Sequence, residues 1–285
     1  MTLLRRMPWI AWVAAIAVAI SGCAVNPLTG EEEPLFMSVD EELALGRQLA
    51  PEVERELHGP IPDEALQHYI DRVGQRIAGA SHRPDWEYRY VAVEDGMVNA
   101  LALPGGHVYI TRGLLEKLTS EAQLAGILAH ETVHVVARDS AVAMTKANII
   151  NYGLLAAAAS GRVGGQALRA AQVSSYFMML SYSREDEQEA DLGGLDYMVA
   201  AGYNPQAMVD TMKIFQDLDK VRPIEFFSTH PSPENRIRYL QDAVGTQFAN
   251  SENLKVGADE FKAKVLDFLK THPKPKKRRA GEGDR

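Results

Sequence analysis

The stretch "AHETVH" combines two imidazoles and a carboxylate at a spacing that suits metal chemistry. His130 and His134 are four residues apart, and Glu131 directly follows the first histidine. Positions four apart on a helix lie on one face, so both rings can bind one ion. Neutral imidazole suits zinc, and a carboxylate beside zinc can take a proton from attacking water. The pattern predicts a catalytic zinc site with Glu131 as general base, although it also arises by chance on surface helices.

A catalytic zinc ion usually has three protein ligands, so one more side chain is needed. The segment "SREDEQEADLGG" offers five acids, Glu185, Asp186, Glu187, Glu189 and Asp191. Glu187 and Asp191 share a helical face, and Gly194 continues it, which would let this helix approach the first closely. We expect Glu187 to bind zinc and Asp191 to orient a histidine. The alternative is a solvated, acidic helix start.

The patterns around these motifs predict an α+β fold that is mainly helical. Strands are expected within 86–93 and 97–113, the latter with a turn at Pro104-Gly105-Gly106. The helix of the first motif begins at Ser120, where Gln123 completes a capping box. Residues 141–182 are a candidate lid or, equally, a buried helix pair with a loop. Other helices are expected at 39–57, 63–80, 183–202, 205–220, 233–243 and about 258–271.

The N-terminus has the pattern of an export signal. Arg5 and Arg6 precede the apolar run "WIAWVAAIAVAI", which is short for a bilayer span, so a membrane anchor is the less favoured alternative. The run ends in "ISGC", which resembles a bacterial lipobox, and Cys23 has no second cysteine for an internal disulfide. We expect lipidation at Cys23. Ala24 after it resembles the default signal for sorting to the outer membrane.

These signals divide the chain into five parts. They are a lipoprotein signal peptide (1–22), the lipidated cysteine with a tether (23–38), a catalytic domain (39–245), a helical extension (246–272) and a basic disordered tail (273–285). The net charge of −8 argues against nucleic acid as a partner. The tail segment "KPKKRRAGEGDR" is too polar to pack. It adds solubility or, alternatively, contacts anionic lipid head groups or peptidoglycan.

Five motifs follow one another along the chain: "NPLTG", "NALALPGGHVYITRGLL", "HETVH", "EQEAD" and "THPSPENR". Together they resemble the family of zinc metallopeptidases related to the CAAX prenyl protease, in particular its periplasmic lipoprotein branch. The resemblance extends to about residue 243. It implies a gluzincin-type metallopeptidase domain, with a small β-sheet beside the HExxH helix, and endopeptidase activity. It also implies one zinc ion on His130, His134 and Glu187, with Glu131 as base and Asp191 in support.

The resemblance also singles out His230, with Arg236 as its companion. In relatives this histidine is viewed as a switch that caps the zinc or as an aid to the transition state, whereas from the residues alone it only precedes a helix. Either 99–103 or 106–111 resembles the edge on which relatives align an extended substrate; the alternative is an ordinary paired hairpin. Relatives often continue the first motif with Arg-His. Here Asp139 follows Arg138, which puts only local packing in doubt.

These features lead us to expect a zinc-dependent endopeptidase of the bacterial envelope, an outer-membrane lipoprotein facing the periplasm. Its expected substrates are misfolded or misassembled periplasmic and outer-membrane proteins, in protein quality control. The membrane, through the lipid on Cys23, and the outer-membrane assembly machinery are the other expected partners. The alternative is a zinc-stabilised assembly factor or chaperone with little or no proteolysis. Glu131 argues against it, because a purely structural zinc site needs no base.

Overall fold

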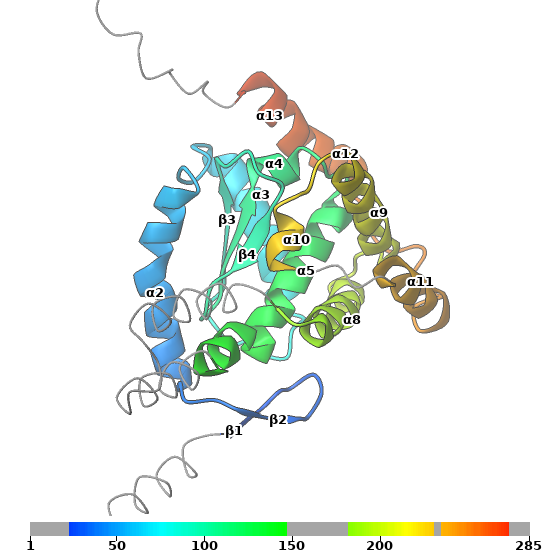
Figure 1. Ribbon diagram of the computed structural model, residues 1–285. Helices are drawn as coiled ribbons and strands as arrows, with labels where there is room; N and C mark the ends of the chain where they lie inside the picture. The colour runs from blue at the N-terminus through cyan, green and yellow to red at the C-terminus, as the bar shows by residue number, and fades with distance from the viewer. Residues whose placement is uncertain (1–22, 147–181, 231–234, 274–285) are drawn as a thin grey trace, which may run out of the picture.

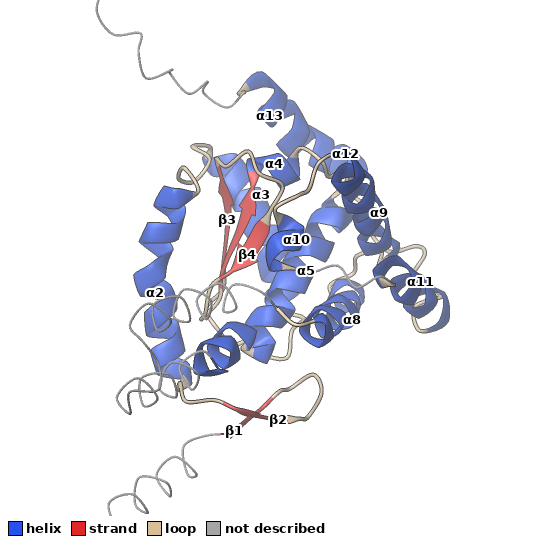
Figure 2. Cartoon of the chain, viewed as in Figure 1, coloured by secondary structure: helices blue, strands red, loops and turns tan. Residues whose placement is uncertain are grey.

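The computed structural model describes residues 23–146, 182–230 and 235–273. The predicted signal peptide, most of the candidate lid and all but the first residue of the predicted tail lie outside these ranges. Within them, helices predominate around a small sheet (Figure 2), so the expected α+β, mainly helical fold is confirmed. No helix of the described ranges is long and apolar enough to cross a membrane.

Two helices with side-chain caps begin the segment predicted as the main domain. Helix α2 spans Val39–Glu56, and Ser38 and Glu41 cap it reciprocally. Helix α3 spans Glu64–Ala78, and Asp63 accepts a hydrogen bond from the backbone N–H of Leu66 at its start. Both lie within about two residues of the predicted boundaries, because the caps and the apolar periodicity are local signals.

The sheet has the strand order β3-β5-β4. Strand β3 (Arg89–Val93) runs parallel to β5 (His107–Thr111), and β4 (Ala100–Ala102) pairs antiparallel with β5. The predicted hairpin is therefore present, with its turn at Pro104-Gly105-Gly106. Strand β5 has a partner on both sides, so only β3 and β4 have an outer edge.

The outer edge of β3 is closed by side chains from α3 and, at its C-terminal end, by backbone hydrogen bonds with Gly59 and Ile61. Gln75 donates to the carbonyl of Tyr88, and Asp71 accepts from the N–H of Tyr90. Gln67 bonds both the N–H and the C=O of Ala92. The three α3 residues are four apart, so one helix face supplies the partners that a further strand would otherwise provide.

The outer edge of β4 is not closed in this way. Leu103 donates its N–H to His107, and Asn99 accepts from Thr111, so the odd-numbered residues pair with β5. The N–H and C=O of Ala100 and Ala102 therefore point away from β5. Within the described ranges these groups have no backbone partner.

Helix α5 (Glu121–Ala137) is the central element of the domain, and all its residues are buried. It lies between the sheet and the later helices (Figure 1) and contacts β4, α3, α8 and α9. Ser120 caps it as predicted, but the Gln123 side chain accepts from the N–H of Thr119 instead of completing the box. A helix with apolar residues on every side is buried on every side, so α5 is held rigidly.

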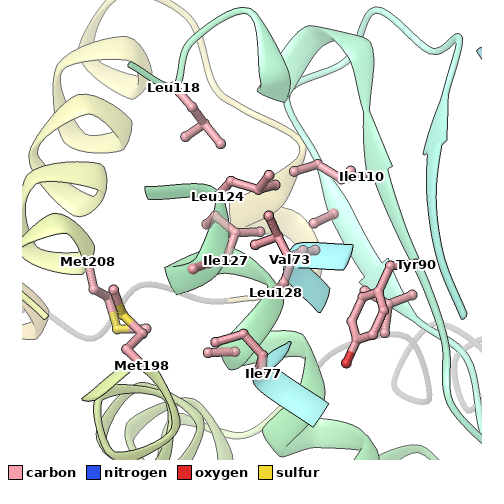
Figure 3. Close-up of a cluster of buried hydrophobic side chains, with 14 of the residues drawn as sticks. Val73, Ile77, Tyr90, Ile110, Leu118, Leu124, Ile127, Leu128, Met198 and Met208 are labelled. Carbon is pink, nitrogen blue, oxygen red and sulfur yellow. The ribbon is translucent and has the colours of Figure 1, made fainter. Parts of the chain in front are cut away.

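The core lies on both sides of α5. Leu124, Ile127 and Leu128 of α5 pack between side chains of the sheet, of α3 and of the later helices (Figure 3). A short helix, α4 (Arg112–Leu115), connects β5 to this region. The site-bearing helix is thus fixed by packing from several directions.

The C-terminal part consists of helices that cover α5. Helices α8 (Arg184–Ala200) and α9 (Gln206–Val221) are followed by the short α10 (Phe226–Thr229) and by α11 (Arg236–Thr246). The helix predicted at 233–243 corresponds to α11, but residues 231–234, which include its predicted start, lie outside the described ranges. The predicted helix at 258–271 is present as α12 (Ala258–Phe261), a π-helical turn (Lys262–Leu266) and α13 (Asp267–Thr271).

The segment predicted as a tether, 24–38, is instead an ordered hairpin. Strands β1 (Cys23–Val25) and β2 (Glu32–Pro34) pair antiparallel, and the turn between them ends at Gly30 with a positive φ. The Asn26 side chain donates to Glu189 of α8 at 2.8 Å, and Leu35 is buried against Ala141 and Val142. These contacts join residues that are distant in the sequence. Local composition could not reveal them, so it suggested only a tether.

Candidate metal centre

Four side chains with metal-binding atoms meet beside α5. His130 and His134 come from α5, Glu187 from the first turn of α8, and His230 from the residue that ends α10. Their candidate ligand atoms all lie within 4.8 Å of one another, and all four residues are buried. The structure thus brings together the three residues that the sequence predicted as ligands, and it adds His230.

The distances show that the two rings and the carboxylate face a common point. The Nε2 atoms of His130 and His134 are 3.2 Å apart. Glu187 Oε2 lies 3.6 Å from the Nε2 of His130, and its Oε1 lies 3.5 Å from that of His134. Two imidazole nitrogens and one carboxylate are a donor set found in catalytic zinc sites.

The close approach of α8 to α5 depends on glycine, as the sequence predicted. A Cβ added at Gly194 would lie 3.4 Å from the backbone nitrogen of His130 and 2.9 Å from Cε of Met208. At Gly193 it would lie 3.1 Å from a methyl group of Val133. The absence of side chains on this face lets Glu187, about two turns earlier, reach the histidines.

Each α5 histidine is oriented by its own carboxylate. His130 Nδ1 lies 3.1 Å from Asp191 Oδ1, and His134 Nδ1 lies 2.6 Å from Asp139 Oδ2. A carboxylate on Nδ1 leaves Nε2 free to face the ion. Asp191 was predicted in this role, but Asp139 was not. The only signal for Asp139 in the sequence was that it stands where relatives often have histidine.

Arg236 and Tyr239 of α11 hold Asp191 in place. The guanidinium of Arg236 donates two hydrogen bonds to the Asp191 carboxylate, at 2.6 and 2.7 Å, and Tyr239 donates a third. Arg236 Nη1 also lies 3.0 Å from Glu187 Oε2. The sequence pointed to Arg236 as a companion of His230, but its polar contacts are with the two carboxylates and, at 3.3 Å, with His130 Nδ1. Tyr239 carried no signal in the sequence.

The electrostatics of the cluster favour positive charge between the carboxylates. Burial would lower the pKa of His134, but Asp139 and Glu187 raise it to about 10. Burial would raise the pKa of Glu187, yet the charges of His230 and His130 hold it well below its ordinary value. A divalent cation supplies the positive charge that this arrangement favours, so the residues fit a bound metal.

Glu131 is buried, and neither of its carboxylate oxygens has a hydrogen-bond partner among the described residues. Its Oε1 lies 3.5 Å from His230 Nε2. A buried carboxylate left without a partner costs free energy, so the fold must retain it against that cost. Such a group is free to accept a proton from a molecule that enters the cluster.

His230 and Tyr182 complete the surroundings of the site. His230 Nδ1 lies 2.7 Å from Glu187 Oε1, and the Phe226 ring stacks against the imidazole at 4.4 Å between centroids. The Tyr182 ring stacks on His134 at 3.8 Å between centroids, with an angle of 6° between the planes. Tyr182 ends the region predicted as a lid; otherwise only residues 141–146 of that region are described.

Comparison with known proteins agrees with this arrangement. The model of peptidase family M48 matches residues 64–244. The chain is 30% identical over 224 residues to the β-barrel assembly-enhancing protease of Escherichia coli K12. The matched region covers 74% of this chain and 45% of that protein. It is 31% identical over 214 residues to the mitochondrial metalloendopeptidase OMA1 of Schizosaccharomyces pombe, with coverages of 71% and 62%. For OMA1 of Saccharomyces cerevisiae the identity is 27% over 249 residues, with coverages of 78% and 71%. The chain thus spans about half the length of the bacterial relatives that it matches.

Proposed function

This chain belongs to peptidase family M48, and we propose that it is a metalloendopeptidase with one zinc ion held by His130, His134 and Glu187. The observation that carries the proposal is Glu131, a buried carboxylate without a hydrogen-bond partner in the described part of the chain, beside the converging ligand atoms. A site that only stabilised the fold would not need it. Two histidines and a glutamate, with a carboxylate base nearby, suit hydrolysis of a peptide bond.

The residues around the cluster have distinct tasks in this reaction. When bound, zinc would polarise the scissile carbonyl and make water more acidic. Glu131 accepts the proton of the attacking water and returns it to the leaving nitrogen. His230, 3.5 Å from Glu131, is placed to donate to the carbonyl oxygen as negative charge develops there. In the structure, His230 Nδ1 instead lies 2.7 Å from Glu187 Oε1, a contact that supports its proposed second role as a switch that caps the zinc.

We infer that an extended substrate pairs with the outer edge of β4. Ala100 and Ala102 direct unpaired backbone groups there, and β4 contacts α5. The N–H of Phe226 at the start of α10 bonds the carbonyl of Val98, so the segment leading to His230 begins beside this edge. Backbone pairing accepts many sequences, which suits a protease that acts on unfolded segments.

We also propose a setting in the bacterial envelope, with a lipid on Cys23 and the protein facing the periplasm from the outer membrane. The signal-like N-terminus and its lipobox support export. Two of the compared relatives, by their names, act in mitochondria and one in β-barrel assembly. The proposed substrates are misfolded or misassembled periplasmic and outer-membrane proteins, and the assembly machinery is a candidate partner.

The experiment that tests the function compares Glu131→Gln with the parent protein. The variant should keep about one zinc per chain by mass spectrometry, because Glu131 is not a ligand, but lose casein cleavage by at least about 10²–10⁴-fold. Glu185→Gln, an exposed acid in the run that contains Glu187, is the matched control and should cleave like the parent. Zinc without cleavage in the parent would favour the assembly-factor alternative, in which Glu131→Gln retains cellular function.

A second variant tests His230. His230→Ala should still bind zinc, because the three proposed ligands are unchanged, but should cleave casein more slowly, because the donor to the developing negative charge is lost. A variant with the cleavage rate of the parent would remove His230 from the mechanism.

A further inference from the structure

We propose that Asp139 is a positioning residue for the metal, one that selects the ring orientation and tautomer in which His134 turns Nε2 toward the ion. The inference rests on the proposed zinc site but concerns a residue that the family resemblance does not assign. Relatives often have histidine at this position, and from the sequence alone we expected no more than a change in local packing.

The contact is short and buried. Asp139 Oδ2 lies 2.6 Å from His134 Nδ1, and the Asp139 side chain is only 8% exposed. A hydrogen bond between an imidazole N–H and a carboxylate in such surroundings is a strong one. It places the proton on Nδ1, so Nε2 is left with the lone pair that binds a metal.

Packing alone would not decide the orientation of the ring. Tyr182 stacks almost parallel to His134, which fixes the plane of the imidazole. A rotation of 180° about the Cβ–Cγ bond keeps that plane but exchanges Nδ1 with carbon and moves Nε2 away from the ion. The stacking contact is similar in both orientations. The 2.6 Å hydrogen bond to Asp139 distinguishes them, and it is shorter than the 3.5 Å contact of Nε2 with Glu187.

The end of α5 is shaped so that Asp139 reaches back to this ring. In a continuous helix, residue 139 would point about 140° away from residue 134 around the axis. Instead Arg138 ends the helix with φ 65° and ψ 29°, the left-handed region that residues other than glycine rarely adopt. Arg138 is held there by a 2.6 Å ion pair with Glu42 of α2 and by a hydrogen bond to the carbonyl of Met37. An unfavoured backbone conformation, fixed by two contacts, therefore delivers the carboxylate.

Asp139 also differs from Asp191 in a way that makes it testable. Asp191 accepts two hydrogen bonds from the buried Arg236, so its removal would leave this cation with Glu187 as its only carboxylate partner among the described residues. Among the described residues, His134 is the only hydrogen-bond partner of the Asp139 side chain. Substitution at Asp139 therefore affects one ligand and leaves no buried arginine unpaired.

The experiment measures zinc affinity by competition with a chromophoric chelator for the parent, Asp139→Ala and Asp139→Asn. Asp139→Ala should bind zinc about 10–100-fold more weakly, the range seen when such supporting partners are removed. Asp139→Asn keeps an oxygen that accepts from Nδ1–H and should recover most of that loss. The exposed Asp196→Ala on α8 is the control and should match the parent. The absorption spectrum with cobalt(II) should change in Asp139→Ala and be largely restored in Asp139→Asn.

The outcomes separate this inference from the proposed function. If Asp139→Ala binds zinc as tightly as the parent, or if the Asn variant is as weak as the Ala variant, Asp139 does not position His134 through its hydrogen bond. A parent that binds no zinc would overturn the metal site itself, and the role of Asp139 with it. Both the zinc site and the role of Asp139 are supported if the parent binds zinc, His134→Ala does not, Asp139→Ala binds it more weakly and Asp139→Asn recovers most of the affinity.

Discussion

At the scale of single residues, the site depends on partners that the ligand motif does not contain. Each α5 histidine has a carboxylate on Nδ1, and Asp191 has an arginine and a tyrosine of its own. Buried charges are tolerated in proteins when they are paired and hydrogen-bonded. Glu131 is the exception in the described part of the chain, and it is the residue to which we assign proton transfer.

Arg236 provides a residue-scale prediction. Arg236→Met should lower the free energy of unfolding of the metal-free protein by about 3–5 kcal/mol, because Asp191 and Glu187 would remain buried without their cation. Arg236→Lys should recover only part of this, since an ammonium group cannot form the two parallel bonds to Asp191. Urea unfolding measures both. The neighbouring, exposed Arg238→Met should stay within about 0.5 kcal/mol of the parent. Equal unfolding of the Arg236→Met and Arg238→Met variants would contradict the role of this network.

At the scale of elements, close packing against α5 and the sheet decides where helices lie. Helices α8 and α3 have glycines where they approach other elements, and the side chains of α3 close the edge of β3. Among the described residues, the outer edge of β4 has no such partners. This difference is why we propose β4 rather than β3 as the strand that pairs with an extended peptide.

For Gly74 in α3 we predict whether substitution by alanine raises or lowers the free energy of unfolding. A Cβ at this position would lie 2.1 Å from Cγ of the buried Tyr90 ring. Helix propensity alone would make Gly74→Ala stabilising by about 1 kcal/mol. We expect instead a destabilisation of about 1–3 kcal/mol from overpacking. Gly245→Ala in α11, where nothing lies within 4 Å of the added atom, should be stabilising by up to about 1 kcal/mol. Thermal and urea unfolding measure the pair, and the same sign for both variants would refute the packing argument.

At the scale of the whole molecule, Glu121 joins segments that are far apart in the sequence. It accepts hydrogen bonds from Tyr69 of α3 at 2.8 Å, Tyr203 after α8 at 2.7 Å and Lys255 before α12 at 2.6 Å. Phe261, Val265 and Leu269 of the C-terminal extension are buried against the main core. The helical extension is therefore integrated with the catalytic domain rather than appended to it.

Glu121→Gln should lower the free energy of unfolding by about 1.5–3 kcal/mol at neutral pH, because a buried charged acceptor is lost. Burial would raise the pKa of Glu121, but Lys255 and the tyrosines lower it below 4.5. A lowered pKa stabilises the fold above the unfolded-state value and ceases to do so as pH falls through the folded-state value. The difference between parent and variant in urea unfolding should therefore shrink below about pH 4.5. Glu116→Gln, which changes an exposed acid, serves as control. A difference that stays constant with pH would show that the charge of Glu121 is unimportant.

The sequence alone predicted the elements and the residues whose signals are local. The helix caps, the strand turn and the pair His130 and His134 depend on spacings of a few residues, which helix and strand geometry converts directly into position. Glu187 could be selected from its acidic run by assuming that the helix faces α5. In the structure, the Glu187 carboxylate lies beside His130 and His134 of α5, as that assumption required.

Only the tertiary structure decided which partners meet across long sequence separations. It showed that Asp139 contacts His134, that Tyr239 and Arg236 hold Asp191, and that the segment 24–38 contains a hairpin that contacts α8. It also showed which strand edge is closed. Aspartates, tyrosines and glutamines occur on many surfaces, so their type carries little information. Their roles arise when packing of the apolar core brings distant segments together and makes each buried polar group find a partner.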